Sequence, residues 1–214
     1  MTDLGFIHRF VPGSDARAPV LLLLHGTGGD ENDLIPLGRE LLPGAAILGV
    51  RGNVLENGMP RFFRRLAEGV FDLPDLERRT AELAGFIENA RRAYGLAENA
   101  LVAVGYSNGA NIAASLILRD PPRLSAAVLF RAMVPFTPDA VPGLGGMPIF
   151  LSAGQTDPIV PGANTRQLAK MFESGGAHVF IHWHDGGHEL GSDDIQAARL
   201  WLARQNFVPD VRTE

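Results

Sequence analysis

A serine between two glycines is the residue of this chain whose setting most favours nucleophilic chemistry. Ser107 lies in the stretch Leu101–Ala110, LVAVGYSNGA, with Gly105 and Gly109 two residues away on either side. A G-x-S-x-G between a strand and a helix is typical of a nucleophile elbow, where a side chain at either glycine would crowd the neighbouring strand or helix. Alone the pattern is weak evidence, because a serine after a strand is more often an ordinary turn residue.

Two further polar residues could supply the partners that a nucleophilic serine needs. Asp157 follows the apolar run Pro148–Ser152, and His188 follows the run His178–Trp183. A histidine takes the serine proton and returns it to the leaving group, and a carboxylate holds the imidazole tautomer. Separately, Asp157 could cap a turn and His188 could be a half-buried polar group. Their occurrence in the order Ser, Asp, His, each after a predicted strand, favours a catalytic triad.

A glycine-rich loop and the residue after the serine could stabilise an oxyanion. The loop His25–Gly29 follows the apolar run Val20–Leu24 and would offer a backbone N–H, and Asn108 would offer a second. Losing one such donor typically lowers the rate by about 10²–10³-fold. His25 itself precedes the serine, so we expect its ring to orient the loop rather than to act as the base.

Short apolar runs alternate with longer amphipathic segments along the chain. The predicted strands are Val20–Leu24, Ala45–Val50, Leu101–Val104, Ala126–Phe130, Pro148–Ser152 and His178–Trp183, with Phe6–Phe10 as a further edge strand that could be antiparallel. The predicted helices are Leu76–Tyr94, Asn108–Leu118, Asn164–Glu173 and Asp193–Gln205. This alternation predicts an α/β fold, with a mostly parallel central sheet flanked by helices on both faces. The carboxyl ends of the strands, where these candidate residues lie, then meet at one edge.

Size and composition narrow the classes of function. The 214 residues, 46% of them hydrophobic, predict one domain over residues 1–214. A net charge of −5 argues against a nucleic-acid partner, and the absence of cysteine excludes disulfides and a thiol nucleophile. We see no secretory signal in the first residues and no apolar run of the roughly 18 residues that a membrane span needs. The expectation is a cytoplasmic protein.

Two groups of acidic or histidine side chains could be interpreted as metal sites. His182, His184 and His188 could be combined into a zinc cluster. Alternation in a strand places His182 and His184 on one face, but no third ligand lies at a spacing that is recognisable for zinc. Asp193 and Asp194 open a predicted helix, where carboxylates are favoured by the helix dipole. We therefore expect no metal and no other cofactor.

Four stretches, LHGTGGDENDL, GYSNGANIA, GQTDPIVP and GGHEL, together resemble the phospholipase/carboxylesterase family of α/β-hydrolases. That family includes bacterial carboxylesterases and acyl-protein thioesterases, and the resemblance extends from about Val20 to the final helix. It implies an α/β-hydrolase fold with a minimal lid or none. The site residues that it implies are Ser107 as nucleophile, Asp157 as acid, His188 as base, and the backbone amides of Thr27 and Asn108 as the oxyanion hole.

The chain departs from that family at two places. Asn108 stands where the family often has glutamine, which alters the pocket wall but keeps the backbone donor. The loop Asn57–Phe71, NGMPRFFRRLAEGVF, looks closer to a bacterial subgroup of predicted esterases, some similar to hydrolases linked to quinone or aromatic-compound stress.

This loop also suggests residues for a substrate pocket. Phe62 or Phe63 could wall an aromatic or short acyl pocket, and Arg64 or Arg65 could meet a substrate carboxylate. Met133, after the predicted strand Ala126–Phe130, is a further apolar candidate. For most of these residues we favour the other interpretation, a solvated loop whose aromatic side chains pack on the core and whose arginines pair with nearby acids.

The function predicted from these observations is hydrolysis of small, short-acyl carboxylic esters through an acyl-serine intermediate. One alternative is a thioesterase or lysophospholipase with the same triad. Two others are a ligand receptor on a hydrolase scaffold and a lyase or C–C bond hydrolase. The expected partner is a small-molecule ester, and the sequence leaves a homodimer open.

Overall fold

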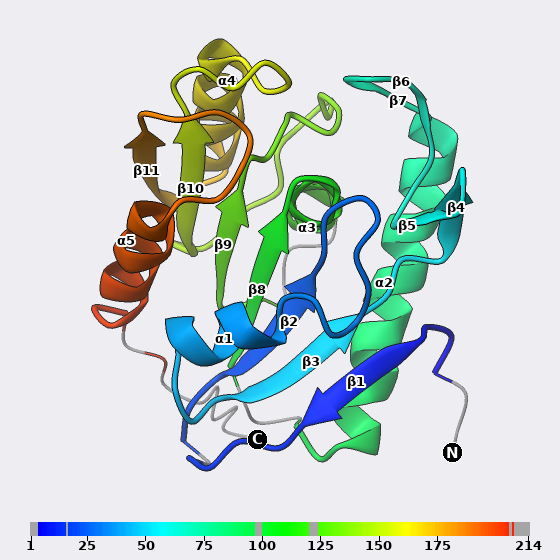
Figure 1. Cartoon of the computed structure of the whole chain (residues 1–214), viewed down its shortest axis with the longest axis vertical. Helices are drawn as coiled ribbons and strands as arrows, with labels where there is room; N and C mark the ends of the chain where they lie inside the picture. Colours follow the sequence, from blue (N-terminus) through cyan, green and yellow to red (C-terminus); the bar gives the residue numbers. More distant parts are fainter. Residues whose placement is uncertain (1–3, 16, 97–99, 120–123, 206, 208–214) are drawn as a thin grey trace.

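The computed structural model describes residues 4–15, 17–96, 100–119, 124–205 and 207, and in this part of the chain seven strands form one sheet (Figure 1). Their order across the sheet is β1-β3-β2-β8-β9-β10-β11. The bounds are β1 His8–Val11, β2 Val20–Leu24, β3 Ala46–Val50, β8 Leu101–Tyr106, β9 Ala126–Phe130, β10 Pro148–Gly154 and β11 His178–His184. Only the edge strand β1 is antiparallel to its neighbour, and the other pairs are parallel. Both ends of the predicted 1–214 domain lie outside the described residues.

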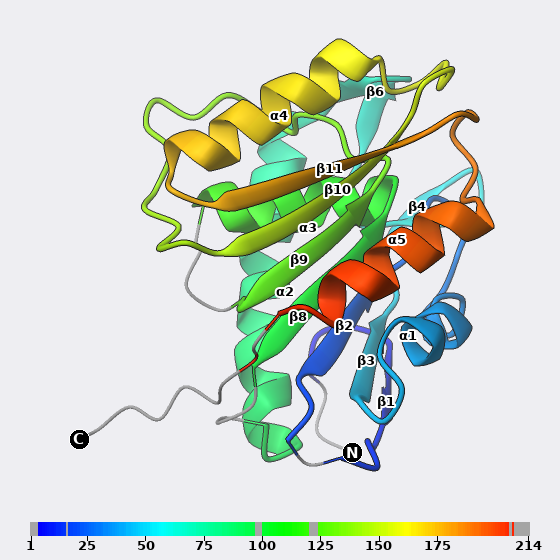
Figure 2. The ribbon, with the colours of Figure 1, turned by 90° about the vertical axis from the view of Figure 1, so that its left-hand side faces the viewer.

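Helices cover both faces of this sheet, as the alternating pattern predicts (Figure 2). Their bounds are α1 Ile35–Leu41, α2 Leu73–Ala93, α3 Asn108–Arg119, α4 Gly162–Ser174 and α5 Ser192–Leu202. Apolar side chains of α2, α3 and α4 form one core with one face of the sheet, and those of α1 and α5 form a second core with the other face. The continuous apolar strands β2 and β9 are buried along their whole length because helices cover them on both sides.

Two short hairpins replace the loop expected over Asn57–Phe71. Strands β4 (Val54–Glu56) and β5 (Met59–Arg61) form the first, and β6 (Arg65–Ala67) and β7 (Val70–Phe71) form the second. Asn57 and Gly58 join β4 to β5 with φ angles of 52° and 80°. An Asn-Gly pair adopts this left-handed turn readily and is a strong hairpin signal, so the first hairpin had a signature in the sequence. The short helix α1 was also not predicted.

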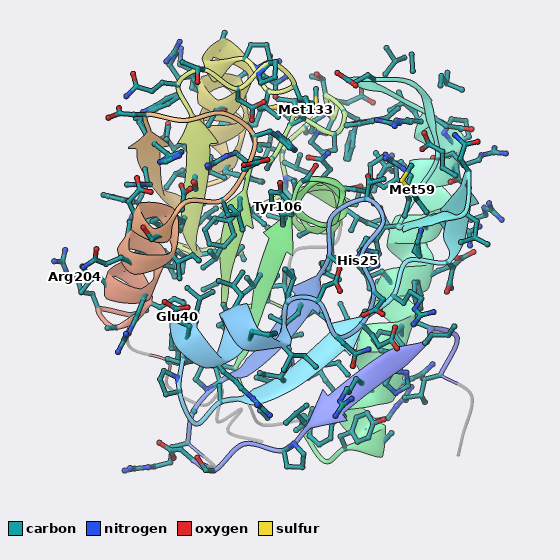
Figure 3. All side chains as sticks on the ribbon, viewed as in Figure 1. His25, Glu40, Met59, Tyr106, Met133 and Arg204 are labelled. Atoms are coloured by element: carbon teal, nitrogen blue, oxygen red, sulfur yellow. The ribbon has the colours of Figure 1, made fainter. Side chains whose placement is uncertain are left out.

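The candidate residues lie beyond the carboxyl ends of the parallel strands, on the side of the sheet toward which the arrows of β8, β9, β10 and β11 point in Figure 1. Tyr106, the last residue of β8, and Met133, beyond the end of β9, are labelled there in Figure 3. None of the helices among the described residues combines the length and the apolar composition needed to cross a bilayer.

Candidate active site

Ser107 occupies a tight turn between β8 and α3. Its φ angle is 51°, in the left-handed region that residues other than glycine rarely adopt, and its N–H donates to the Phe130 carbonyl at 2.9 Å. A Cβ at Gly105 would lie 2.7 Å from the Ala110 backbone, and a Cβ at Gly109 would overlap the Leu24 carbonyl. Only glycines at these two positions let the strand, the turn and the helix approach so closely. The G-x-S-x-G spacing therefore has the steric cause inferred from the sequence.

His188 and Asp157 form a continuous hydrogen-bonded line with Ser107. His188 Nε2 lies 2.9 Å from Ser107 Oγ, and His188 Nδ1 lies 2.8 Å from Asp157 Oδ2. The other Asp157 oxygen accepts the backbone N–H groups of Ile159 and Val160 at 2.8 and 3.0 Å. The Asp157 side chain is fully buried, so its position is fixed by these contacts. This arrangement can take a proton from the serine and hold the resulting imidazolium.

The loop His25–Gly29 faces the turn at Ser107. His25 Nε2 accepts the N–H of Gly52 at 3.0 Å, and its Nδ1 then donates to the Gly26 carbonyl at 2.6 Å. Burial lowers the pKa of His25, which favours the neutral ring that these two contacts require. The expectation that His25 orients the loop is confirmed by these contacts.

The predicted oxyanion donors are the backbone N–H groups of two residues at one cavity. Thr27 and Asn108 both line it beside Ser107. Among the hydrogen bonds of the described residues, none uses the backbone N–H of Thr27 or of Asn108. An N–H group without an acceptor beside the serine is what an oxyanion donor requires.

The cavity over Ser107 has a volume of about 220 Å³. It is lined by Thr27, Arg61, Arg65, Glu68, Gly69, Phe71, Tyr106, Ser107, Asn108, Asn111, Arg131, Met133, Ile159, Val160 and His188. The side chains come from the strand ends on one side and from the two hairpins on the other.

Three of the five predicted pocket residues lie elsewhere. Arg65 and Met133 line the cavity, but Phe62 and Phe63 are buried in the hydrophobic core with no exposed surface. Arg64 points to solvent, where its side chain is 61% exposed and pairs with Asp72 at 2.8 Å. For these three residues the pocket assignment was wrong and the other interpretation of the loop is correct: the aromatic pair, in the segment between the hairpins, packs on the core, and Arg64 pairs with an acid.

Two residues that line the cavity form contacts that the sequence did not suggest. Arg61 is buried and its Nη1 donates to Thr27 Oγ1 at 2.6 Å; burial lowers its pKa, and the neighbouring Arg65 adds to this. Asn108 Oδ1 accepts the N–H of Phe62 at 2.7 Å, so the residue after Ser107 anchors the segment between the hairpins. Asn108 itself also lines the cavity, at the position where the sequence departs from the usual glutamine.

The histidines and acids near α5 are engaged with each other. His184, Asp193 and Asp194 place ligand-type atoms within 4.8 Å of one another. Asp194, however, accepts from Arg131, Ser152 and the Gly191 N–H, and His184 contacts Asp193 at 2.7 Å. This donor set is accounted for by the protein itself, and we assign no metal to it.

Comparisons with known proteins agree with this arrangement. The putative hydrolase MhqD of Bacillus subtilis (strain 168) is 49% identical over 182 residues, which are 85% of this chain and 91% of that protein. The crystal structure of the Bacillus cereus carboxylesterase matches with a TM-score of 0.92 and 47% identity, over 94% of this chain and 95% of that one. The structure of YahD with malic acid matches with a TM-score of 0.89 and 30% identity, over 94% and 100% of the two chains.

These similarities confirm the α/β-hydrolase fold and identify a hydrolase. Residues 72–196, which include Ser107, Asp157 and His188, match the dienelactone hydrolase family. The phospholipase/carboxylesterase family expected from the motifs is not confirmed by this match. The chain belongs to the dienelactone hydrolase family of α/β-hydrolases.

Proposed function

We propose that this protein is a serine carboxylesterase that hydrolyses small esters through an acyl-serine intermediate. The observation that carries the proposal is the line from Ser107 Oγ to His188 Nε2 at 2.9 Å and from His188 Nδ1 to Asp157 Oδ2 at 2.8 Å, at the surface of a cavity. The 47% identity to a carboxylesterase supports the same reaction class.

Each half-reaction uses the same three side chains. His188 accepts the Ser107 proton as Oγ attacks the ester carbonyl, and the backbone N–H groups of Thr27 and Asn108 receive the developing oxyanion. The imidazolium, stabilised by Asp157, then protonates the departing alkoxide, which leaves as the alcohol. Water enters, gives its proton to His188, and attacks the acyl carbonyl. Collapse of that intermediate releases the carboxylic acid and returns the proton to Ser107.

The cavity dimensions favour short acyl groups. A volume of about 220 Å³ accommodates a small substrate, and its wall combines polar residues with Phe71 and Met133. We propose that this member of the dienelactone hydrolase family is most similar in function to esterases of the phospholipase/carboxylesterase type, because the four stretches quoted above resemble them. A thioesterase or lysophospholipase is the alternative, and substrate chain length and leaving-group chemistry separate the two.

Hydrolysis of p-nitrophenyl esters from acetate to decanoate tests the proposal, with Ser107→Ala as the control. We expect activity that is highest on the shortest chains and absent from the variant. An optimum on the longest chains would favour a lysophospholipase, and a preference for acyl thioesters over matched esters would favour a thioesterase. A wild-type protein without activity on any of these compounds would contradict the proposal.

A carboxylate on the substrate is a second feature that specific contacts favour. Arg61 and Arg65 both line the cavity and share one acid, Glu56, at 3.1 and 2.9 Å. A related protein has been solved with malic acid, a dicarboxylate. We propose that Arg65 contacts an anionic group of the substrate.

Arg64 and Arg65 provide a matched pair to test this. Arg64 is an adjacent, exposed arginine outside the cavity, so Arg64→Ala serves as the control for Arg65→Ala. We expect Arg65→Ala to raise KM for hemisuccinate-type esters several-fold more than for neutral esters of the same length. Equal changes for the two ester types would contradict the carboxylate contact.

A homodimer, a cytoplasmic location and one domain over residues 1–214 stay predictions.

A further inference from the structure

Arg131 is a buried cation that the reaction itself does not use. It follows β9, and its side chain has no exposed surface. Its guanidinium forms a paired contact with Asp194, with Nη1 3.0 Å from Oδ1 and Nη2 2.7 Å from Oδ2. Nη1 also donates to Ser152 Oγ at 2.5 Å. These contacts use three of the five guanidinium N–H groups.

The two remaining N–H groups of Arg131 reach the loop that carries His188. Nε donates to the Gly187 carbonyl at 3.0 Å, and Nη2 donates to the Glu189 carbonyl at 2.7 Å. The hydroxyl of Tyr106 donates to the carbonyl between them, that of His188, at 3.1 Å. Three consecutive carbonyl groups centred on His188 are therefore held by two side chains from neighbouring strand ends.

The backbone at Arg131 is also unusual in a way that parallels Ser107. Its φ angle is 56°, and its N–H donates to the Ser152 carbonyl at 2.8 Å, as the Ser107 N–H donates to the Phe130 carbonyl. Left-handed backbone at a residue other than glycine is unfavourable and persists where the surrounding contacts enforce it. The turn aims the Arg131 side chain across the end of β10 toward the loop 185–191.

Asp194 holds the last residue of the loop 185–191. It lies in the first turn of α5, and its Oδ2 accepts the N–H of Gly191 at 2.9 Å. Burial raises the pKa of Asp194, but the hydrogen bonds from Arg131 and Ser152 outweigh this and the net pKa is lowered, so the pair is charged. The loop 185–191 is thus tied to one buried ion pair through the carbonyls on either side of His188 and through its last residue.

We propose that Arg131 is the positioning residue for His188, acting through the Gly187 and Glu189 carbonyls to hold the imidazole between Ser107 and Asp157. The inference rests on the proposed function. A catalytic group that is displaced by about 1 Å can lose on the order of 10²-fold in rate, so loss of this clamp lowers kcat while substrate binding is kept.

The test compares the wild-type protein with the double variant Arg131→Met/Asp194→Asn. Removing only one member of the pair would leave the other charged and buried without its partner, which can prevent folding. The double variant removes the Arg131 contacts to the Gly187 and Glu189 carbonyls, keeps an acceptor for the Gly191 N–H and leaves no unpaired charge. Arg119→Met, which removes an arginine paired with Glu77 on the surface, is the control for an arginine distant from the loop.

Two readouts decide the outcome: ester kinetics, and the low-field proton resonance of His188 Nδ1–H, which needs no substrate. We expect kcat of the double variant to be about 10²-fold below that of the wild-type protein and of Arg119→Met, with KM within about twofold and the resonance shifted or lost. Wild-type kcat and an unchanged resonance in the double variant would overturn the inference. If the wild-type protein hydrolyses no ester, the proposed function fails and the resonance alone decides the inference.

Discussion

The two sides of the cavity are built in different ways. On the strand side, Ser107 and His188 lie in turns that pack directly on other backbone segments and on buried polar groups. On the hairpin side, apolar residues face solvent, and Leu55 and Leu66 are 71% and 73% exposed. The first side fixes reacting atoms. The second side is anchored where Arg61 and Phe62 meet the rest of the molecule, and it leaves the outer faces of its hairpins exposed.

This difference separates the consequences of substitution. On the strand side a small change in a side chain or a glycine displaces groups that must meet within hydrogen-bond distance. On the hairpin side an exposed residue can change with little loss of stability, because it has few contacts to lose. We therefore expect losses in kcat from the first side and changes in KM from the second.

The largest effect is expected from Asp157→Asn. The amide keeps the shape but favours the wrong imidazole tautomer and removes the negative charge beside His188, so kcat should fall by about 10⁴-fold. Steady-state kinetics with p-nitrophenyl acetate measures it. Asp185→Asn, which alters an exposed acid paired with Gln155, is the matched control and should retain activity. A loss of less than tenfold for Asp157→Asn would contradict the role of this acid.

A smaller loss is expected from Gly154→Ala on the same side. The new Cβ would overlap the carbonyls of Gly186 and Gly187, so the loop carrying His188 must move away from β10. We expect kcat to fall by about 10²-fold with KM nearly unchanged. Gly85→Ala, where nothing lies within 4 Å in helix α2, is the control and should leave kcat unaltered. Full activity of Gly154→Ala would show that the loop tolerates displacement.

The pH dependence of the free energy of unfolding tests how the loop His25–Gly29 is held. Because burial lowers the pKa of His25 in the folded protein, the unfolded chain binds its proton first as the pH falls. The stabilisation by neutral His25 is complete above about pH 6.5 and decreases below it, by no more than about 1.4 kcal/mol per pH unit. Urea unfolding at pH 7.5 and 5.5 should show a weaker pH dependence for His25→Gln, which keeps an acceptor for Gly52. The same pH dependence in both proteins would contradict this assignment.

The smallest effect is expected on the hairpin side, from Leu66→Ser. Leu66 is largely exposed on β6, so the free energy of unfolding should change by less than about 0.5 kcal/mol. Leu83→Ala in the buried face of α2 is the contrast and should cost about 2–5 kcal/mol. Urea denaturation compares the two. A large loss for Leu66→Ser would mean that the hairpins are part of the cooperative core.

The strand side was largely predictable because its constraints are local. Apolar runs bounded by glycine predicted the strands, and the required close approach left Gly105 and Gly109 in the sequence as a visible pattern. Ser107, Asp157 and His188 could be combined because parallel strands end at one edge, and their side chains lie within hydrogen-bond distance of one another.

The hairpin side depended on information that the sequence carries weakly. Phe62 and Phe63 lie between strands of two or three residues that show no clear alternation, so RFFRR alone left open whether they wall the cavity or pack on the core. The contacts of Arg61 and Arg131 were missed for another reason. They join residues 34 and 56–63 positions apart, a separation for which a single sequence holds no pattern.

The central claim is that Ser107 forms a covalent intermediate, and fluorophosphonate labelling followed by peptide mass spectrometry tests it most directly. We predict one adduct per chain, on the peptide that contains Ser107, with loss of esterase activity in proportion to labelling and no adduct in Ser107→Ala. Esterase activity that survives complete labelling, or an adduct on another residue, would contradict the claim.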